Sequence, residues 1–75
     1  MNAFELYEAV FDSANEYAQA TTEYVSQYAE NALDKHISSD VANQIIECHI
    51  AFKNKGNGNN DYFHMVEKPL SAIEI

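Results

Sequence analysis

The sequence predicts an all-α protein, and two observations support that fold class. From Ala3 to about Asp34, apolar residues recur at alternating steps of three and four with no glycine or proline between them. A second segment, residues 39–54, repeats this spacing after serines that suit the start of a helix. The 75 residues allow one domain. We expect a long N-terminal helix, a second helix antiparallel to it and a short C-terminal element.

The first element is expected to be a single helix over about residues 3–34. Its apolar seam consists of Phe4, Tyr7, Phe11, Ala14, Ala18, Thr21, Val25, Tyr28 and Ala32. The acidic residues fall on the opposite side, within an arc of roughly 80° at about 100° per residue. They are Glu5, Glu8, Asp12, Glu16, Glu23, Glu30 and Asp34. This arc keeps its phase over the whole segment, which favours an unbroken helix.

Two features of the same segment also allow an interrupted helix as an alternative. The β-branched pair Thr21-Thr22 lowers helix propensity and permits a kink. Ser13 and Glu16 have the spacing of a capping box, so a helix start at Ser13 is an alternative. A kink near Thr21 would fold the chain into a compact monomer of three or four helices.

The second helix is expected over about residues 39–54. Ser38 and Ser39 are natural N-caps, and Asp40 suits the first turn. The apolar positions Val41, Ile45, Cys48 and Phe52 share one face. Lysines near the last turn and Gly56 beyond it are typical of a helix end.

The remaining residues predict a loop and a short element. Residues 55–61 are rich in asparagine and glycine and read as a loop. Residues 62–68 suit either a short helix or a strand, and Pro69 is expected to end a helix at or before Lys68. Residues 69–75 are expected to form an extended tail, frayed or docked on the helices.

The geometry of a long helix argues for a homodimer. A helix of about 32 residues is roughly 48 Å long, and the second helix covers about half of it. The apolar arc, about 160° wide, is broader than one partner helix usually buries. A large exposed apolar patch would remain, so we expect a second copy of the chain to cover it.

Charge narrows the classes of partner. The net charge is −8, arginine is absent, and no lysine precedes Lys35. Direct binding to nucleic acid or to an anionic membrane needs clustered cations, so neither is expected. No apolar run approaches the ~20 residues that span a bilayer, and the one cysteine cannot form an internal disulfide. A cytoplasmic protein is therefore expected.

The acidic arc predicts a binding face for another protein with a basic surface. The expected function is thus a non-enzymatic protein-interaction module. Glu8, Asp12 and Glu16 would lie about 6 Å apart along a helix, close to the phosphate spacing of a nucleic-acid strand. The alternative is therefore an inhibitor that mimics nucleic acid and blocks the basic groove of a nucleic-acid-binding protein. A dimeric scaffold, in which the arc only keeps the protein soluble, is a third possibility.

Aromatic residues concentrate in the same segment and predict an apolar interface. They are Phe4, Tyr7, Phe11, Tyr17, Tyr24 and Tyr28. Base stacking by tyrosine works beside cations, which this segment lacks. A core or subunit interface is therefore the preferred role.

No pattern predicts a metal, a cofactor or a catalytic centre. His36, Cys48, His49 and His64 do not have the spacing of metal ligands. The glycines at 56 and 58 are not followed by the lysine of a phosphate-binding loop. Cys48 is expected to be a small core residue, and His49 a residue at the edge of the apolar face with one nitrogen in water.

Overall fold

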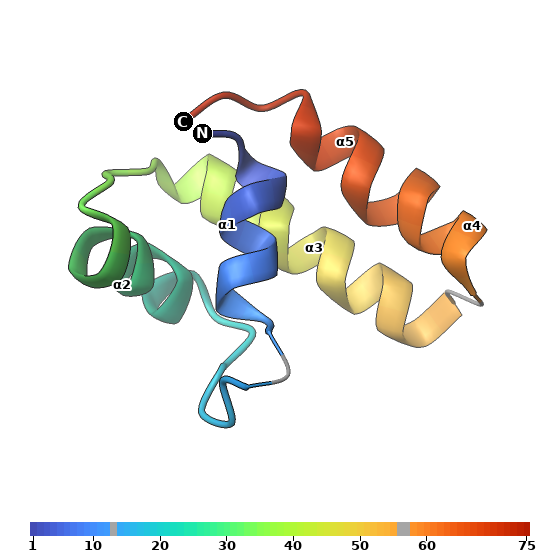
Figure 1. Cartoon of the computed structure of the whole chain (residues 1–75), viewed down its shortest axis with the longest axis horizontal. Helices are drawn as coiled ribbons and strands as arrows, with labels where there is room; N and C mark the ends of the chain where they lie inside the picture. Colours follow the sequence, from blue (N-terminus) through green and yellow to red (C-terminus); the bar gives the residue numbers. More distant parts are fainter. Residues whose placement is uncertain (13, 56–57) are drawn as a thin grey trace.

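Helices make up the regular structure of this computed structural model, which describes residues 1–12, 14–55 and 58–75. The elements in chain order are α1 Ala3–Val10, α2 Thr22–Leu33, α3 Ser39–Lys55, α4 Asn59–Tyr62, the π-helix η1 Phe63–Glu67 and α5 Lys68–Ser71 (Figure 1). No strand occurs within the described residues; an isolated bridge pairs Asn2 with Glu74. The prediction of an all-α fold is confirmed.

The single helix predicted over residues 3–34 is wrong. Asn2 is the N-cap of α1: its side chain accepts a hydrogen bond from the Glu5 amide at 2.9 Å, while the Glu5 carboxylate accepts one from the Asn2 amide. This capping box satisfies two amides at the helix start. The helix ends after eight residues, and its C-cap Phe11 donates its amide to the Tyr7 carbonyl.

Polar side chains stabilise the break that follows α1. The Asp12 carboxylate accepts a hydrogen bond from the Ala14 amide at 2.9 Å, which closes a local turn. The Asn15 side chain donates to the Val10 carbonyl at 3.0 Å and to the Tyr24 hydroxyl at 2.9 Å. Bonds of this kind offer the backbone an alternative to the helical ladder. The helix-like spacing of the acidic residues gives no information about these side-chain hydrogen bonds.

The weak point predicted at Thr21-Thr22 is the start of α2. Thr21 has an extended backbone, and its hydroxyl accepts a hydrogen bond from the Tyr24 amide at 3.1 Å. Threonine is a favoured N-cap for this reason. The alternative start, at Ser13 with Glu16, falls at a residue outside those described.

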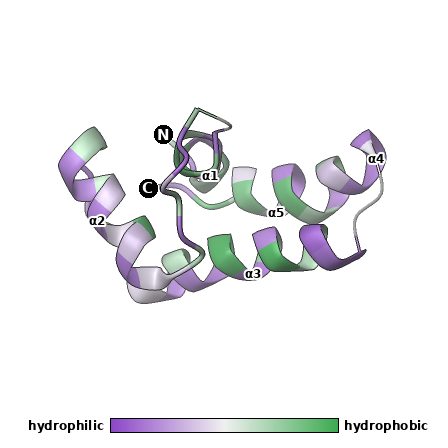
Figure 2. Ribbon diagram, turned by 90° about the horizontal axis from the view of Figure 1, so that it is seen from below, coloured by the Kyte–Doolittle hydropathy of each residue, from purple (hydrophilic) through white to green (hydrophobic). Residues whose placement is uncertain are grey.

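Breaking the helix lets α1 and α2 contribute to one core. Val10 at the end of α1 and Val25 in α2 are both fully buried, with Ile45 of α3 in the same cluster. The C-terminal helical segment lies alongside α3, and Figure 2 shows apolar residues on both. The buried residues are Ala3, Leu6, Tyr7, Val10, Val25, Ala29, Ile37, Ala42, Ile45, Ile46, Val66 and Leu70.

α3 spans Ser39–Lys55, within one residue of the range expected from the sequence. The Ser38 hydroxyl accepts a hydrogen bond from the Val41 amide at 3.2 Å and so caps the first turn. Asp40 lies in that turn, and Lys53 and Lys55 lie in the last turn, each favourable to the helix dipole.

The C-terminal segment is helical from Asn59 to Ser71, so the strand alternative for residues 62–68 is wrong. The loop predicted over 55–61 is shorter, because Lys55 belongs to α3 and Asn59 begins α4. Residues 56 and 57, including the predicted stop at Gly56, lie outside those described. Gly58 precedes α4 with φ +92°, a backbone conformation that glycine adopts without strain.

Pro69 lies inside the last helix, which the sequence did not predict. The π-helix η1 ends at Glu67, and the amide of the next residue, Lys68, donates to the Phe63 carbonyl five residues back. A proline lacks the amide hydrogen and clashes with the carbonyl four residues back in an α-helix. Pro69 lies in the first turn of α5, directly after the π-helix, and the chain continues helically through it to Ser71.

The predicted tail over 69–75 is therefore extended only after the helix ends, and it docks beside the N-terminus (Figure 1). The Ala3 amide donates to the Ile73 carbonyl at 2.8 Å, and the Ile75 amide donates to the Met1 carbonyl at 3.0 Å. Ile73 and Ile75 pack against the core, which holds the two termini together.

The expectation of a dimer depended on one long N-terminal helix with an uncovered apolar face, and the molecule is too short to contain such a helix. The principal extents are 32 × 26 × 17 Å, shorter than a helix of roughly 48 Å. The radius of gyration is 11.4 Å, close to the value of about 11 Å for a compact chain of this length. None of the helices in the described part of the chain has the length and apolarity needed to cross a lipid bilayer.

Candidate functional site

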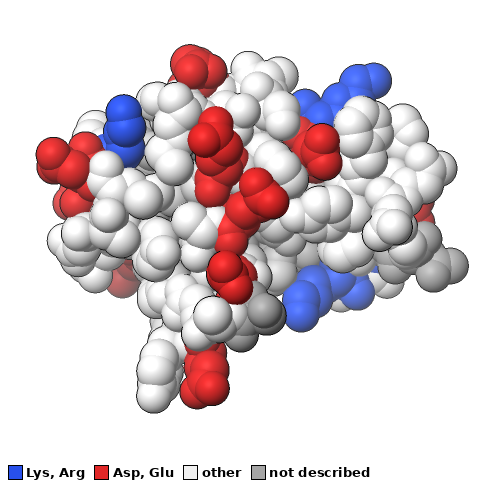
Figure 3. All heavy atoms as spheres, in the orientation of Figure 1, with Lys and Arg blue, Asp and Glu red and all other residues white. Residues whose placement is uncertain are grey.

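All seven acidic residues of the predicted binding face are exposed, but the broken helix divides them. Four belong to α1 and the segment after it; we call Glu5, Glu8, Asp12 and Glu16 the α1 acidic surface. Figure 3 shows acidic side chains in a line down one face of the molecule, over α1. The other three, Glu23, Glu30 and Asp34, belong to α2 and its C-cap.

The carboxylates of the α1 acidic surface form no ion pair with a lysine within the described part of the chain. The Glu30 carboxylate, on α2, lies 3.3 Å from the His36 ring at an exposed position. The N-terminal ammonium lies 3.5 Å from Glu74. The carboxylates of the α1 acidic surface are therefore exposed and are not held in ion pairs with lysine within the described residues.

Most of the predicted apolar interface is internal. Tyr7 is 5% exposed, and Phe4, Phe11, Tyr24 and Tyr28 pack against the core. The structure thus assigns these five side chains to the monomer's own packing. Tyr17 differs, because it lies in the segment between α1 and α2 and is 81% exposed.

A groove of about 420 Å³ opens between α3 and the end of α1 with the segment that follows it. We call it the aromatic groove. Its lining residues are Tyr7, Phe11, Asp12, Asn15, Ala18, Ala20, His49, Phe52 and Lys53. Asp12 is shared with the α1 acidic surface, so the charged surface and the groove are continuous.

Tyr7, Phe11 and His49 form one wall of the groove. The Tyr7 hydroxyl lies 2.9 Å from Nδ1 of His49, a distance that permits a hydrogen bond. The Phe11 ring stacks on the His49 ring, with centroids 3.9 Å apart and planes inclined by 10°. The two contacts fix the orientation of the imidazole.

Burial holds both polar members of this wall in their neutral forms. Burial raises the pKa of Tyr7 to about 12, with smaller contributions from Tyr62 and Cys48. Burial also lowers the pKa of His49, and the positive charge of Lys53 adds to that effect. When neutral His49 has its proton on Nε2, its Nδ1 accepts a hydrogen bond from the Tyr7 hydroxyl. This pair therefore serves as a polar contact within an aromatic wall.

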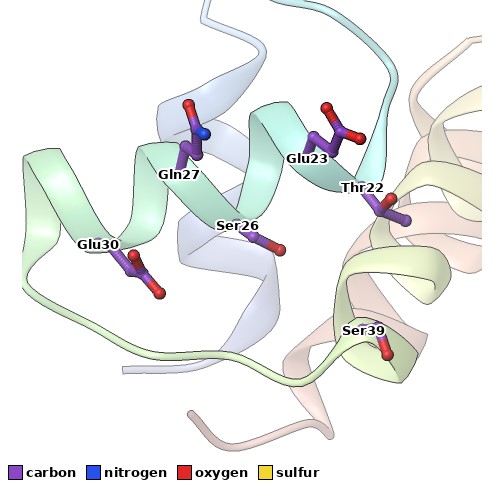
Figure 4. A pocket seen from close by; sticks show the side chains of 6 residues that line it. All are labelled: Thr22, Glu23, Ser26, Gln27, Glu30 and Ser39. Carbon is purple, nitrogen blue, oxygen red and sulfur yellow. The ribbon is translucent and has the colours of Figure 1, made fainter.

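A second depression, of about 320 Å³, lies between α2 and the first turn of α3 (Figure 4). The residues that line it all have polar or acidic side chains: Thr22, Glu23, Ser26, Gln27, Glu30 and Ser39. Figure 4 shows Ser26 and Glu30 on the side of α2 toward the chain that leads to Ser39. Two of the predicted acidic residues thus belong to this depression, whereas Asp12 lines the aromatic groove.

Over residues 1–12, 14–55 and 58–75, no three or more His, Cys, Asp or Glu side chains are grouped so that they could hold a metal ion. Cys48 is a half-buried free thiol, and burial raises its pKa, with Glu47 adding to the shift. A raised pKa leaves less of the reactive thiolate near neutral pH.

The sequence did not indicate that three polar residues of the groove, Asn15, His49 and Lys53, belong to a site. His49 was expected at an edge, and Asn15 and Lys53 were assigned no role in a site. His49 and Lys53 are four apart, a spacing that places both on one face of a helix, so that signal was present. The sequence contained no such signal for Asn15, because its hydrogen-bond partners Val10 and Tyr24 come close to one side chain only when the helix is broken.

No protein-family model, curated protein or solved structure matches this chain.

Proposed function

We propose that this protein acts without catalysis, by binding another protein through the α1 acidic surface. The observation that supports this is the exposure of Glu5, Glu8, Asp12 and Glu16 with no lysine paired to them among the described residues. Charge of one sign on one face attracts a partner of opposite sign and orients it. The partner is accordingly a protein with a basic surface.

The aromatic groove supplies the apolar part of such an interface. It adjoins the acidic surface at Asp12 and presents the aromatic side chains of Phe11 and Phe52. Buried aromatic contacts carry much of the affinity in protein interfaces, whereas rim charges mainly set the association rate and the salt dependence.

The test is affinity capture from an extract of the source organism, with a charge-reversed variant and a matched control. Glu8→Lys/Glu16→Lys reverses two exposed charges of the α1 acidic surface. Glu30→Lys/Glu47→Lys makes the same change in net charge at exposed positions on α2 and α3. We expect the control and the unaltered chain to capture the same partner at low salt, and the first variant to capture at least tenfold less.

Salt supplies the second arm of the test. Raising the ionic strength from about 0.05 M to about 0.5 M shortens the Debye length and weakens exposed charge pairs. A partner retained equally at both salt concentrations, or lost equally with both variants, contradicts a role for the α1 acidic surface.

The inhibitor that mimics nucleic acid is less well supported by the geometry. α1 ends at Val10, so Asp12 and Glu16 do not continue the helical row of Glu8 at about 6 Å intervals. A duplex oligonucleotide separates the two functions in the same assay. Release of the captured protein by the oligonucleotide identifies a mimic, and retention supports the general protein-interaction module.

We also propose that the chain associates with a second copy of itself, through a surface other than the one the sequence indicated. Tyr7 and four of the other predicted interface aromatics are occupied within the monomer. Tyr17 remains available for contact with another molecule.

A further inference from the structure

The charges within the aromatic groove cancel. Asp12 contributes a carboxylate to its lining, and Lys53 contributes an ammonium group. Burial lowers the pKa of His49, and the charge of Lys53 adds to that effect, so the imidazole is neutral at neutral pH. The remaining lining side chains are uncharged. Taking a charged side chain out of water costs free energy that such a groove does not repay, so the groove favours an uncharged occupant.

The walls and the size of the groove favour an aromatic ring. The rings of Phe11 and Phe52 line it and are only half-buried, so part of each remains open to contact. Ala18 and Ala20, which have short side chains, also line it. A cavity of about 150 Å³ holds benzene, and the groove measures about 420 Å³. Offset and edge-to-face contacts with the rings then favour an aromatic occupant over an aliphatic one.

Contacts within the monomer hold the rings of the groove in place. The Phe11 ring stacks on His49 with centroids 3.9 Å apart, and the Tyr7 hydroxyl lies 2.9 Å from Nδ1 of the same imidazole. The Phe52 ring meets Tyr62 of α4 edge-on, with centroids 5.3 Å apart. Side chains that are already ordered lose little conformational freedom on binding, so more of the contact energy contributes to affinity.

The charge around the groove is one-sided. At Asp12 the groove joins the α1 acidic surface, whose carboxylates are exposed. Lys53 and Lys55 are exposed in the last turn of α3, and Lys53 lines the groove. Figure 3 shows lysine atoms beside the lower part of the acidic line. A cation next to the groove is therefore attracted toward α1 and repelled from the end of α3.

We infer that the groove holds an uncharged aromatic side chain of the basic partner, from a segment whose lysines or arginines all lie on the flank that faces α1. This inference rests on the partner binding proposed above and names the chemistry of the bound segment. The α1 acidic surface attracts and orients the segment, and the aromatic ring supplies affinity. Lys53 disfavours a segment with cations on both flanks, which is specificity by repulsion.

Synthetic peptides test the inference directly, because the chain contains no tryptophan. Each peptide has one tryptophan, capped ends and the same number of lysines. In one peptide the lysines precede the tryptophan, in another they follow it, and in a third, the divided peptide, they are shared between the two flanks. The two one-sided peptides cover both chain directions. Tryptophan emission shifts to shorter wavelength when the ring leaves water, so it reports burial of the aromatic side chain.

We expect one of the one-sided peptides to bind with shifted emission at about 0.05 M ionic strength. It should bind about threefold more tightly than the divided peptide, which is the scale of an exposed charge contact. Lys53→Gln removes the repelling charge and should bring the two peptides to within about twofold of each other. Lys55→Gln, the matched control, changes an exposed lysine of the same turn outside this lining and should preserve the difference.

A second pair of variants tests whether the ring enters the groove. Ala20 is exposed and lines the groove, so Ala20→Phe fills space there without a change in the core. It should weaken binding of the one-sided peptide at least tenfold, and should reduce capture of the basic partner to the same degree. Gln19→Phe adds the same ring at an exposed neighbouring position and should change both by less than twofold. Far-ultraviolet circular dichroism checks that the variants keep their helices.

Three results overturn the inference. Unchanged emission from every peptide up to about 1 mM refutes the aromatic anchor. Equal binding of the one-sided and divided peptides to the unaltered chain refutes the one-sided arrangement of cations. Capture of the partner by Ala20→Phe at the level of Gln19→Phe also refutes the anchor. If Glu8→Lys/Glu16→Lys still loses the partner in that case, the proposed function stands and only the role of the groove is excluded.

Discussion

At the scale of single residues, the structure gives roles to polar side chains that the sequence pattern treated as part of a helix face. His49 and Tyr7 are 42 positions apart, yet their polar atoms lie 2.9 Å from each other. The Phe11 ring covers the imidazole and half-buries it. An imidazole in such a place resists protonation, because the charged form loses hydration and gains a like charge nearby on Lys53.

This arrangement predicts a pH dependence of folding. The pKa of His49 in the folded chain lies below its ordinary value of 6.5, so the unfolded chain binds more protons in acid. The stability that a neutral His49 provides is therefore present above about pH 6.5 and is lost as the pH falls through that value to below the folded-state pKa. Urea denaturation at several pH values between about 7.5 and about 5 measures it.

The comparison is between the unaltered chain and His49→Gln, since falling pH also relieves repulsion among the carboxylates. We expect the difference in free energy of unfolding between the two to shrink or reverse in acid. His64→Gln, at an exposed position, is the control and should track the unaltered chain. A difference that does not change with pH would show that His49 is freely protonated in the folded state.

At the scale of the elements, the ends of the helices decide the topology. Asn2 and Thr21 each cap a helix start with a side-chain oxygen. Asp34 ends α2 with φ +53°, a left-handed conformation that Asp tolerates better than most residues. At Pro69 the helix does not end: the π-helix η1 leads directly into α5, which contains the proline.

The N-cap of α2 gives a direct test of the broken helix. Thr21→Ala removes the oxygen that accepts the Tyr24 amide, and should lower the free energy of unfolding by about 1 kcal/mol. Thr21→Ser keeps a hydroxyl and should lie within about 0.5 kcal/mol of the unaltered chain. Chemical denaturation provides both values. In a continuous helix, alanine at this position would stabilise the protein, so a gain in stability would contradict the break.

At the scale of the whole molecule, the chain buries its apolar residues without help from a second copy. Leu6, Val25, Ile45, Val66 and Leu70 are fully buried and come from five different elements. The docked C-terminal tail adds Ile73 and Ile75 to this core. Folding of the chain therefore does not depend on the proposed association with a second copy.

The fully buried side chains of the core therefore contribute more to stability than exposed apolar side chains do. Leu6→Ala removes a fully buried side chain and should lower the free energy of unfolding by about 2–5 kcal/mol. A domain of this length typically has about 4–11 kcal/mol in total, so the melting temperature should fall sharply. Ile50→Ala, at a position 45% exposed, should cost less than about 1 kcal/mol. Equal losses in the two variants, measured by thermal and urea unfolding at low concentration, would contradict the assignment of the core.

The candidate site was predictable in part. The exposure of every acidic residue from Glu5 to Asp34 follows from charge, because an unpaired carboxylate is rarely buried. The division of these residues between the α1 acidic surface and α2 was not predictable, because the predicted acidic arc depended on one straight helix. The groove needed α1 and α3 to meet, and its Tyr7–His49 contact spans 42 positions. Local spacing contains no information about such a contact.

The sequence by itself determined that the chain is helical, where α3 lies and which charges face water. These properties depend on local propensity, capping and solvation, which neighbouring residues set. Only the tertiary structure decided that residues 3–34 form two helices and that Tyr7 is internal while Tyr17 is exposed. The helix-like spacing of the acidic residues is compatible with a straight helix and with a broken one, because surface carboxylates are equally solvated in both. Packing of Val10 and Val25 into one core, with Asn15 bonded across the break, favours the broken helix.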